Sequence, residues 1–136
     1  MTKYLLCMLS CGLLITTLAK AETVLYCQDE LTTGIAEKDG LWITGDFELE
    51  HHTVIFNDDF TRAEGLTLRP MECKTPLAEQ YPDLVNCISS YGSYETFNYD
   101  KKLRRYTFSA VSNFGYVLGG TPSVTETLHA GTCTSF

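Results

Sequence analysis

Positive charges are scarce in this sequence. The chain has 10 Lys and Arg residues against 17 Asp and Glu residues, a formal net charge of −7. Lys3 and Lys20 lie in an N-terminal segment that we expect to be removed, which leaves a net charge of −9. Nucleic acids and anionic membranes bind through clustered cations. The composition therefore argues against either as the main partner and favours a soluble, acidic protein.

Recognisable catalytic and cofactor motifs are also missing. The sequence has no Gly-x-Ser-x-Gly elbow, no Walker loop, no Gly-x-Gly-x-x-Gly turn and no haem-attachment Cys-x-x-Cys-His. It also lacks Pro/Ser-rich linkers, low-complexity tracts and internal repeats. Residues 22–136 have the length of one domain. We therefore expect a single domain over 22–136 that holds no cofactor and no metal.

The first 21 residues have the pattern of a secretory signal peptide. Lys3 supplies a positive charge, residues 4–18 form an almost unbroken apolar run, and Ala19-Lys20-Ala21 places small residues where signal peptidase reads them. This predicts cleavage after Ala21 and a periplasmic or secreted protein. An alternative is a lipidated N-terminus at Cys11, but apolar sequence continues beyond that residue, which favours the signal peptide.

The cysteines that remain after cleavage predict two disulfides. They are Cys27, Cys73, Cys87 and Cys133. An even number of cysteines in an exported domain is typical of disulfides, and their wide spacing argues against a zinc site. Cys27 lies in the first expected strand and Cys133 in the last, which become neighbours if the sheet closes. Cys73 and Cys87 flank an irregular, proline-containing stretch, so we predict the pairs Cys27–Cys133 and Cys73–Cys87.

Apolar residues recur mostly with a period of two, which predicts an all-β fold. A single antiparallel sheet that curls into a meander or barrel and a two-layer sandwich both remain open. The only helical candidate is residues 76–85, where Pro82 limits the helix to a turn or two. The expected strands are 23–27, 41–50, 53–57, 66–68, 88–91, 94–99, 104–112, 114–118 and 125–134.

Two groups of side chains could bind a ligand. On a regular strand, Glu48, Glu50 and His52 share one face and could approach a metal ion, whereas His51 points the other way. They lack a convincing fourth ligand, so we expect a solvated face and no stoichiometric zinc or calcium. A groove lined by tyrosines is the second alternative. Its members would be Tyr91, Tyr94, Tyr99, Tyr106 and Tyr116.

The best candidate for an interaction surface is basic. Asp100-Lys101-Lys102-Leu103-Arg104-Arg105 forms the expected tip of a hairpin. Lys101, Lys102, Arg104 and Arg105 are half of the cations in the mature chain, and their charge opposes that of the whole molecule. They could dock an acidic partner or an anionic envelope lipid, although charged hairpin tips also serve to keep sheet edges from pairing.

Short segments resemble small exported bacterial proteins of unknown function. They are Val24-Leu25-Tyr26-Cys27, Phe56-Asn57-Asp58-Asp59 and the C-terminal residues 130–136. The resemblance implies a secreted, cysteine-crosslinked, β-rich domain and no catalytic residues. We therefore expect a non-catalytic binding or structural protein of the bacterial envelope. The alternative is a small secreted hydrolase or metal-dependent enzyme that uses Glu48, Glu50 and His52, or His129.

Overall fold

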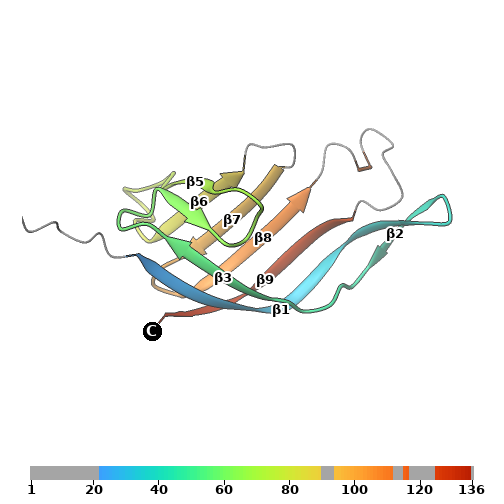
Figure 1. The fold of residues 1–136 in the computed structure, drawn as a ribbon, viewed down its shortest axis with the longest axis horizontal. Helices are drawn as coiled ribbons and strands as arrows, with labels where there is room; N and C mark the ends of the chain where they lie inside the picture. The colour runs from blue at the N-terminus through green and yellow to red at the C-terminus, as the bar shows by residue number, and fades with distance from the viewer. Residues whose placement is uncertain (1–21, 90–93, 112–114, 117–124, 136) are drawn as a thin grey trace, which may run out of the picture.

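The computed structural model describes residues 22–89, 94–111, 115–116 and 125–135. All regular secondary structure in these ranges is β-strand (Figure 1). The all-β prediction is confirmed. The strands are β1 (Thr23–Lys38), β2 (Leu41–Gly45), β3 (His51–Phe56), β4 (Arg62–Glu64), β5 (Met71–Lys74), β6 (Leu84–Ser89), β7 (Tyr94–Asp100), β8 (Arg105–Val111) and β9 (Glu126–Ser135).

The strands form one antiparallel sheet that closes on itself. Its order is β2-β1-β3-β4-β5-β6-β7-β8-β9, and β9 also pairs with β1, from Leu25 opposite Ser135 to Ile35 opposite Glu126. The result is an eight-stranded barrel with one extra strand. Of the two architectures that the sequence left open, the structure therefore has the barrel.

The long strand β1 pairs with two different strands along its length. Its first part pairs with β3 between residues 23 and 28, and its last part pairs with β2 between residues 34 and 38. The resulting β1–β2 hairpin projects beyond the body of the barrel (Figure 1). Because β2 lies outside the closed ring of strands, its apolar residues have little to cover, and Leu41 and Ile43 are exposed.

The barrel interior is packed with side chains from alternate positions of the strands. Three aromatic rings, those of Phe56, Phe97 and Tyr99, pack against one another with centroids 6.1–6.3 Å apart. We call these three residues the aromatic core. The other buried apolar residues of the same cluster include Leu25, Val54, Ala63, Met71, Val85, Cys27, Cys73, Cys87 and Cys133.

The predicted hairpin and the predicted disulfide pairs are present. The hairpin β7–β8 pairs from Tyr94 opposite Val111 to Asp100 opposite Arg105. Cys27 is bonded to Cys133 and Cys73 to Cys87, each across directly paired positions of neighbouring strands. Two disulfides suit an oxidising compartment outside the cytoplasm.

Several predicted elements differ from the structure. The predicted strand 41–50 ends at Gly45, and residues 46–50 are not a strand. Residues 66–68 are a bend, not a strand. Residues 76–80 form turns and residues 76–85 contain no helix, since the chain turns at Leu77 before Pro82 and β6 begins at Leu84. The predicted strand 114–118 falls largely outside the described residues.

The predicted leader also lies outside the described residues, together with its cleavage site and Cys11. In the part of the chain that is described, no helix is both long enough and apolar enough to cross a membrane. The tyrosine groove is not formed as predicted: Tyr99 and Tyr106 are buried in the barrel, whereas Tyr94 and Tyr116 are exposed. Tyr91 is not among the described residues.

Candidate functional site

Asp29 is a carboxylate buried inside the barrel. The alternation along β1 turns Leu25, Cys27 and Asp29 inward, and the exposed fraction of Asp29 is 1%. An irregularity in the pairing with β9 between Asp29 and Leu31 then reverses the faces, so that Leu31 is 70% exposed. Asp29 is therefore the last inward residue before a bulge, a feature that often re-aims a side chain near a functional site.

Both oxygens of Asp29 accept hydrogen bonds. Oδ2 lies 2.9 Å from the backbone nitrogen of Glu50, which donates to it, and 2.8 Å from Nδ1 of His129. Oδ1 accepts the hydroxyl proton of Tyr106. Nε2 of His129 in turn lies 3.1 Å from the hydroxyl of Thr127. Residues of β8, of β9 and of the segment before β3 thus converge on one carboxylate of β1.

His52 completes the group from β3. Its Nε2 lies 3.5 Å from Oδ1 of Asp29, and its ring meets the rings of His129 and Tyr106 edge-on, with centroids 5.7 and 6.2 Å apart. His51, the next residue along the chain, is exposed on the outer face, as strand alternation predicts. We call Asp29, His52, Tyr106 and His129 the buried Asp–His cluster.

Gly131 makes this convergence sterically feasible. It lies on β9 directly between Asp29 of β1 and Tyr106 of β8. A Cβ atom at this position would lie 2.0 Å from the carbonyl oxygen of Gln28 and 3.0 Å from the Cα of Asp29. Only glycine therefore lets β1 approach β9 so closely, and its missing side chain lets the Tyr106 hydroxyl reach Asp29 across β9.

The hydrogen bonds set the charge state of the cluster. Burial raises the pKa of Asp29, but hydrogen bonds from Tyr106, His129 and the Glu50 N–H group lower it more, and the net pKa lies below the ordinary value of 3.8. Burial and the hydrogen bond to Asp29 raise the pKa of Tyr106 well above its ordinary value of 10.0. At neutral pH Asp29 is therefore ionised and Tyr106 remains a neutral donor.

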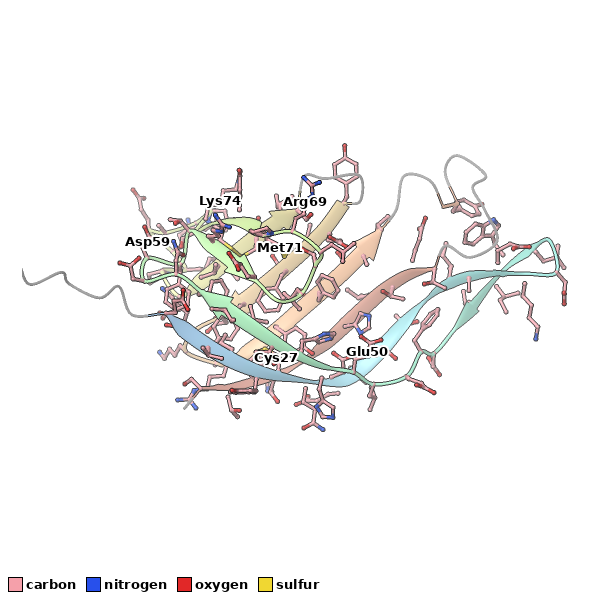
Figure 2. The ribbon with its side chains drawn as sticks, in the orientation of Figure 1. Cys27, Glu50, Asp59, Arg69, Met71 and Lys74 are labelled. Carbon is pink, nitrogen blue, oxygen red and sulfur yellow. A yellow bond between two sulfur atoms is a disulfide. The ribbon has the colours of Figure 1, made fainter. Side chains whose placement is uncertain are left out.

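The predicted face of Glu48, Glu50 and His52 does not exist in the structure. Residues 46–50 leave the regular ladder and are held by side chains of β1 instead, with Glu50 bonded to Asp29 and Phe47 to Thr32. Glu48 and Glu50 are exposed, and Glu50 contributes only its backbone to the cluster (Figure 2). The prediction was wrong because it extended a regular strand through this segment. The two histidines proposed for the enzymatic alternative, His52 and His129, do come together.

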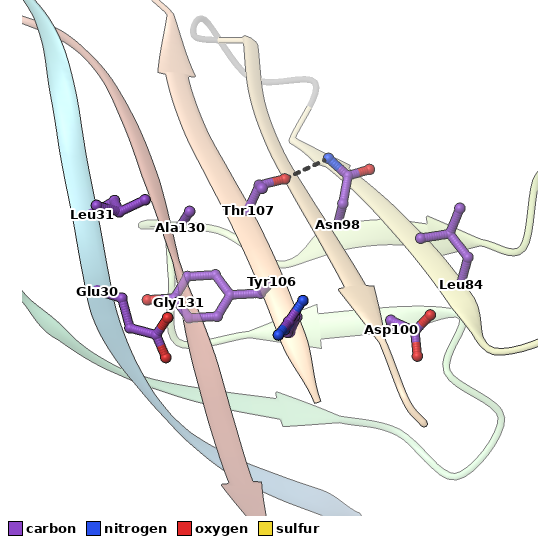
Figure 3. Close-up of a pocket in the computed structure, with 10 residues that line it drawn as sticks. Glu30, Leu31, Leu84, Asn98, Asp100, Tyr106, Thr107, Ala130 and Gly131 are labelled. Carbon is purple, nitrogen blue, oxygen red and sulfur yellow. Dashed lines mark hydrogen bonds between the residues drawn. The ribbon is translucent and has the colours of Figure 1, made fainter. Parts of the chain in front are cut away.

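A second site lies on the outside of the barrel. A groove of about 490 Å³ crosses β1, β9, β8 and β7 toward β6 (Figure 3). We call it the outer groove. Its outward side chains are Glu30, Leu31, Leu84, Asn98, Asp100, Arg105, Thr107 and Ala130.

The predicted basic surface borders this groove. Asp100 and Arg105 line the groove and also begin and end the turn that carries Lys101, Lys102 and Arg104. The Asp100 carboxylate shapes the turn by accepting hydrogen bonds from the backbone nitrogens of Lys102 and Leu103, at 2.9 and 2.7 Å. We call Lys101, Lys102, Arg104 and Arg105 the basic tip.

The chain matches no protein-family model, no curated protein sequence and no solved structure. Its function must therefore be argued from these two sites. Sequence reasoning found His52, His129 and the basic tip, but it missed Asp29 and Tyr106 as members of one cluster. The signal for Asp29 was the alternation Leu25, Cys27, Asp29, in which a carboxylate follows two inward positions.

Proposed function

We propose that this chain is an exported binding protein of the bacterial cell envelope, without catalytic activity of its own. On this proposal it docks an acidic protein partner on the basic tip and the adjoining outer groove. The observation that carries the proposal is a set of cations held without carboxylate partners on a shaped turn, beside a groove that has apolar side chains.

The charges of the basic tip are available to a partner. Among the described residues, none of its four cations forms an ion pair with a carboxylate side chain. Lys102, Arg104 and Arg105 are exposed, whereas Lys101 lies over the ring of Phe60 at 5.2 Å from its centroid. On a molecule with a strong negative net charge, such a patch attracts acidic groups and repels basic ones.

The outer groove supplies the apolar contact that charges alone do not. Leu31 is 70% exposed, and Ala130, its partner on β9, is partly buried. Leu84, also partly buried, lies at the opposite end of the groove on β6 (Figure 3). Interfaces draw most of their affinity from buried apolar contacts, with charges at the rim that steer the encounter and set orientation. An acidic segment with one apolar side chain next to its carboxylates fits this combination.

The proposed location rests on the leader and the disulfides. We propose that residues 1–21 are a signal peptide cleaved after Ala21, and that the mature chain is periplasmic or secreted. The intact mass of the exported protein tests this: a chain beginning within a residue or two of Glu22 is expected. A product that begins at a lipidated Cys11, or one that retains Met1, contradicts it.

The binding proposal is tested by neutralising three cations of the basic tip and, in a control, three cations elsewhere on the surface. The test variant carries Lys102→Gln, Arg104→Gln and Arg105→Gln. The control carries Lys38→Gln, Arg62→Gln and Lys74→Gln, which changes the net charge equally on other exposed positions. Crosslinking in native envelopes should give a partner adduct with wild type and control that the test variant loses, with unchanged melting temperatures. Equal adducts for all three proteins would refute a role of the basic tip.

The alternative function, a small hydrolase or metal-dependent enzyme, draws support from one observation. His129 lies beside a carboxylate, Asp29, which in turn accepts the hydroxyl of Tyr106. A histidine oriented by a carboxylate can act as a general base. In this arrangement, however, Asp29, Tyr106 and His129 are 1%, 3% and 5% exposed. A substrate would need access to atoms that the barrel covers, so we place binding first.

A further inference from the structure

Three side chains of the buried Asp–His cluster offer ligand atoms to one point. Asp29, His52 and His129 each have one carboxylate or imidazole atom that lies within 4.8 Å of the other two. They come from β1, β3 and β9, so the site is fixed by strand pairing instead of by a loop. Asp29 and His129 are buried, and the side chain of His52 is 11% exposed.

His52 has a polar atom that the fold leaves unsatisfied. Its Nε2 is buried and makes no hydrogen bond to any group that the structure describes. Buried polar atoms are normally satisfied, and each exception requires an explanation. This nitrogen faces the Asp29 carboxylate at 3.5 Å, a separation at which one ion can contact both.

Hydrogen bonds from neighbouring residues orient the other two ligands, Asp29 and His129. The Asp29 carboxylate is held by the Glu50 N–H group and the Tyr106 hydroxyl, and each of its oxygens has capacity for a further contact. Nε2 of His129 is hydrogen-bonded to Thr127, and Nδ1 is directed at Asp29 Oδ2. To bind an ion, Nδ1 must give up its hydrogen bond to Asp29, with the ring proton on Nε2 and donated to Thr127 instead. Metal-ligating histidines commonly have their second nitrogen fixed in this way.

We propose that Asp29, His52 and His129 bind one divalent first-row transition-metal ion of the Zn²⁺ type. Two imidazole nitrogens and one carboxylate suit such ions, whereas Ca²⁺ and Mg²⁺ prefer oxygen ligands throughout. Bonds of about 2.0–2.2 Å place tetrahedral ligand atoms roughly 3.3–3.6 Å apart. The 3.5 Å between His52 Nε2 and Asp29 Oδ1 falls in this range, whereas the 2.8 Å between His129 Nδ1 and Asp29 Oδ2 is shorter. The three ligand atoms lie within 4.8 Å of one another, so the imidazoles must shift for one ion to contact all three.

A surface depression lies next to this site. His52 lines this depression of about 230 Å³, together with His51, Tyr26 and Thr132. The depression lies at the junction of β1, β3 and β9, the three strands that carry the ligands. This proposal departs from the expectation, drawn from the sequence, that the chain holds no metal. The ligand set weighed there was Glu48, Glu50 and His52, which shares only His52 with the set proposed here. The proposal is independent of the partner docking argued above.

The experiment compares the three histidines of the chain: His52 and His129 are the proposed ligands, and His51 is the control. Tag-free, oxidised mature protein is dialysed against Zn²⁺ and then against buffer, and the bound metal is measured by elemental analysis. In parallel, the ¹⁵N signals of the His51, His52 and His129 imidazoles are followed as Zn²⁺ is added. His52→Phe removes one ligand but keeps an aromatic ring among Tyr106 and Phe108, and His51→Phe is the matched variant on the outer face.

The expected result is one Zn²⁺ per chain, with large shifts of one nitrogen each in His52 and His129 and none in His51. His52→Phe should bind Zn²⁺ more than about 100-fold more weakly, since even loss of a supporting hydrogen bond costs 10–100-fold. His51→Phe should bind as wild type does, and Ca²⁺ should not compete. The absence of stoichiometric Zn²⁺ from wild type would overturn the proposal. Equal binding by His52→Phe, or loss of binding in His51→Phe, would do the same.

Discussion

The interior of this barrel has two regions of opposite chemistry. The aromatic core of Phe56, Phe97 and Tyr99 is apolar apart from one hydroxyl, and the Tyr99 ring lies nearly parallel to both phenylalanine rings. The buried Asp–His cluster places an ionised carboxylate, that of Asp29 on β1, and two imidazoles inside the same barrel. Both are built by the same inward alternation, so position in the fold does not explain the difference.

The aromatic core and the buried Asp–His cluster contribute differently to the stability of the fold. Burial of apolar rings stabilises a fold directly, whereas a buried charge must first overcome a desolvation penalty. Replacing a buried polar group by an apolar one of similar shape is often neutral or stabilising. A cluster that retains Asp29 and leaves His52 Nε2 unpaired is therefore better explained by binding than by folding. Four changes test this division, beginning with the largest expected effect.

The disulfide Cys27–Cys133 lies at the boundary between the two regions. On β1, Cys27 is the inward residue between Leu25, which belongs to the apolar interior, and Asp29, which belongs to the cluster. This disulfide closes a loop of 106 residues, against 14 for Cys73–Cys87. By loop entropy, Cys27→Ser with Cys133→Ser should lower the free energy of unfolding by roughly 4–5 kcal/mol.

The paired variant, Cys73→Ser with Cys87→Ser, should lose about 3 kcal/mol. Urea unfolding measures both. The first pair should also shift the imidazole signals of His52 and His129, whereas the second should leave them in place. Equal losses with no change at either histidine would show that the long bridge does not hold the cluster.

Phe56→Ala tests the aromatic core itself. Phe56 is fully buried and packs on Phe60, Phe97 and Tyr99. The cavity and the lost burial should lower the free energy of unfolding by about 3–5 kcal/mol. Leu41→Ala, on the exposed β2, should change it by less than about 0.5 kcal/mol. Denaturant midpoints of the two variants that differ little would contradict the assignment of stability to this region.

Tyr106→Phe tests how the cluster holds its charge. Loss of the donor should raise the pKa of Asp29 and lower the free energy of unfolding at pH 7 by about 1.5–3 kcal/mol. Because the native pKa of Asp29 is depressed, its contribution is complete above the unfolded value near 3.8 and is lost as the pH falls through the lower native value.

The part of the acid limb that comes from Asp29 should therefore be smaller in Tyr106→Phe than in wild type, and the difference in unfolding free energy between the two proteins should narrow as the pH falls below about 3.8. Unfolding curves between pH 7 and pH 2 measure it. Tyr94→Phe, which removes a hydroxyl from a ring that is 59% exposed, is the control and should follow wild type. Superimposable acid limbs for Tyr106→Phe and wild type would mean that the hydrogen bond does not set the charge of Asp29.

Much of the fold could be predicted from the sequence because it depends on local rules. The period of two defined the hairpin 94–111, and the layout of the cysteines led to the observed pairing. The bulge after Asp29 could not be predicted, because it depends on pairing with β9 a hundred residues away. The same applies to residues 46–50, where Gly45 hinted at a break but the bonds to Asp29 and Thr32 are tertiary.

Only part of the candidate site could be predicted from the sequence, because the rest depends on tertiary pairing. His52 and His129 were recognisable as chemistry-bearing residues, yet nothing local places them beside Asp29. Strand closure does so: β1 pairs with β3 on one side and with β9 on the other. Once β1 is known to lie between them, Asp29 becomes the residue that both histidines can reach.

The most direct test of the division between stability and binding is the unfolding free energy of His52→Phe, measured against wild type in chelator and in Zn²⁺. In chelator we expect the variant to be as stable as wild type or more so, because the substitution removes an unpaired buried nitrogen from an aromatic setting. At 100 times the dissociation constant, Zn²⁺ should stabilise wild type by about 2.7 kcal/mol and leave the variant unchanged. A variant that is strongly destabilised in chelator, or that gains as much from Zn²⁺ as wild type does, would contradict that division.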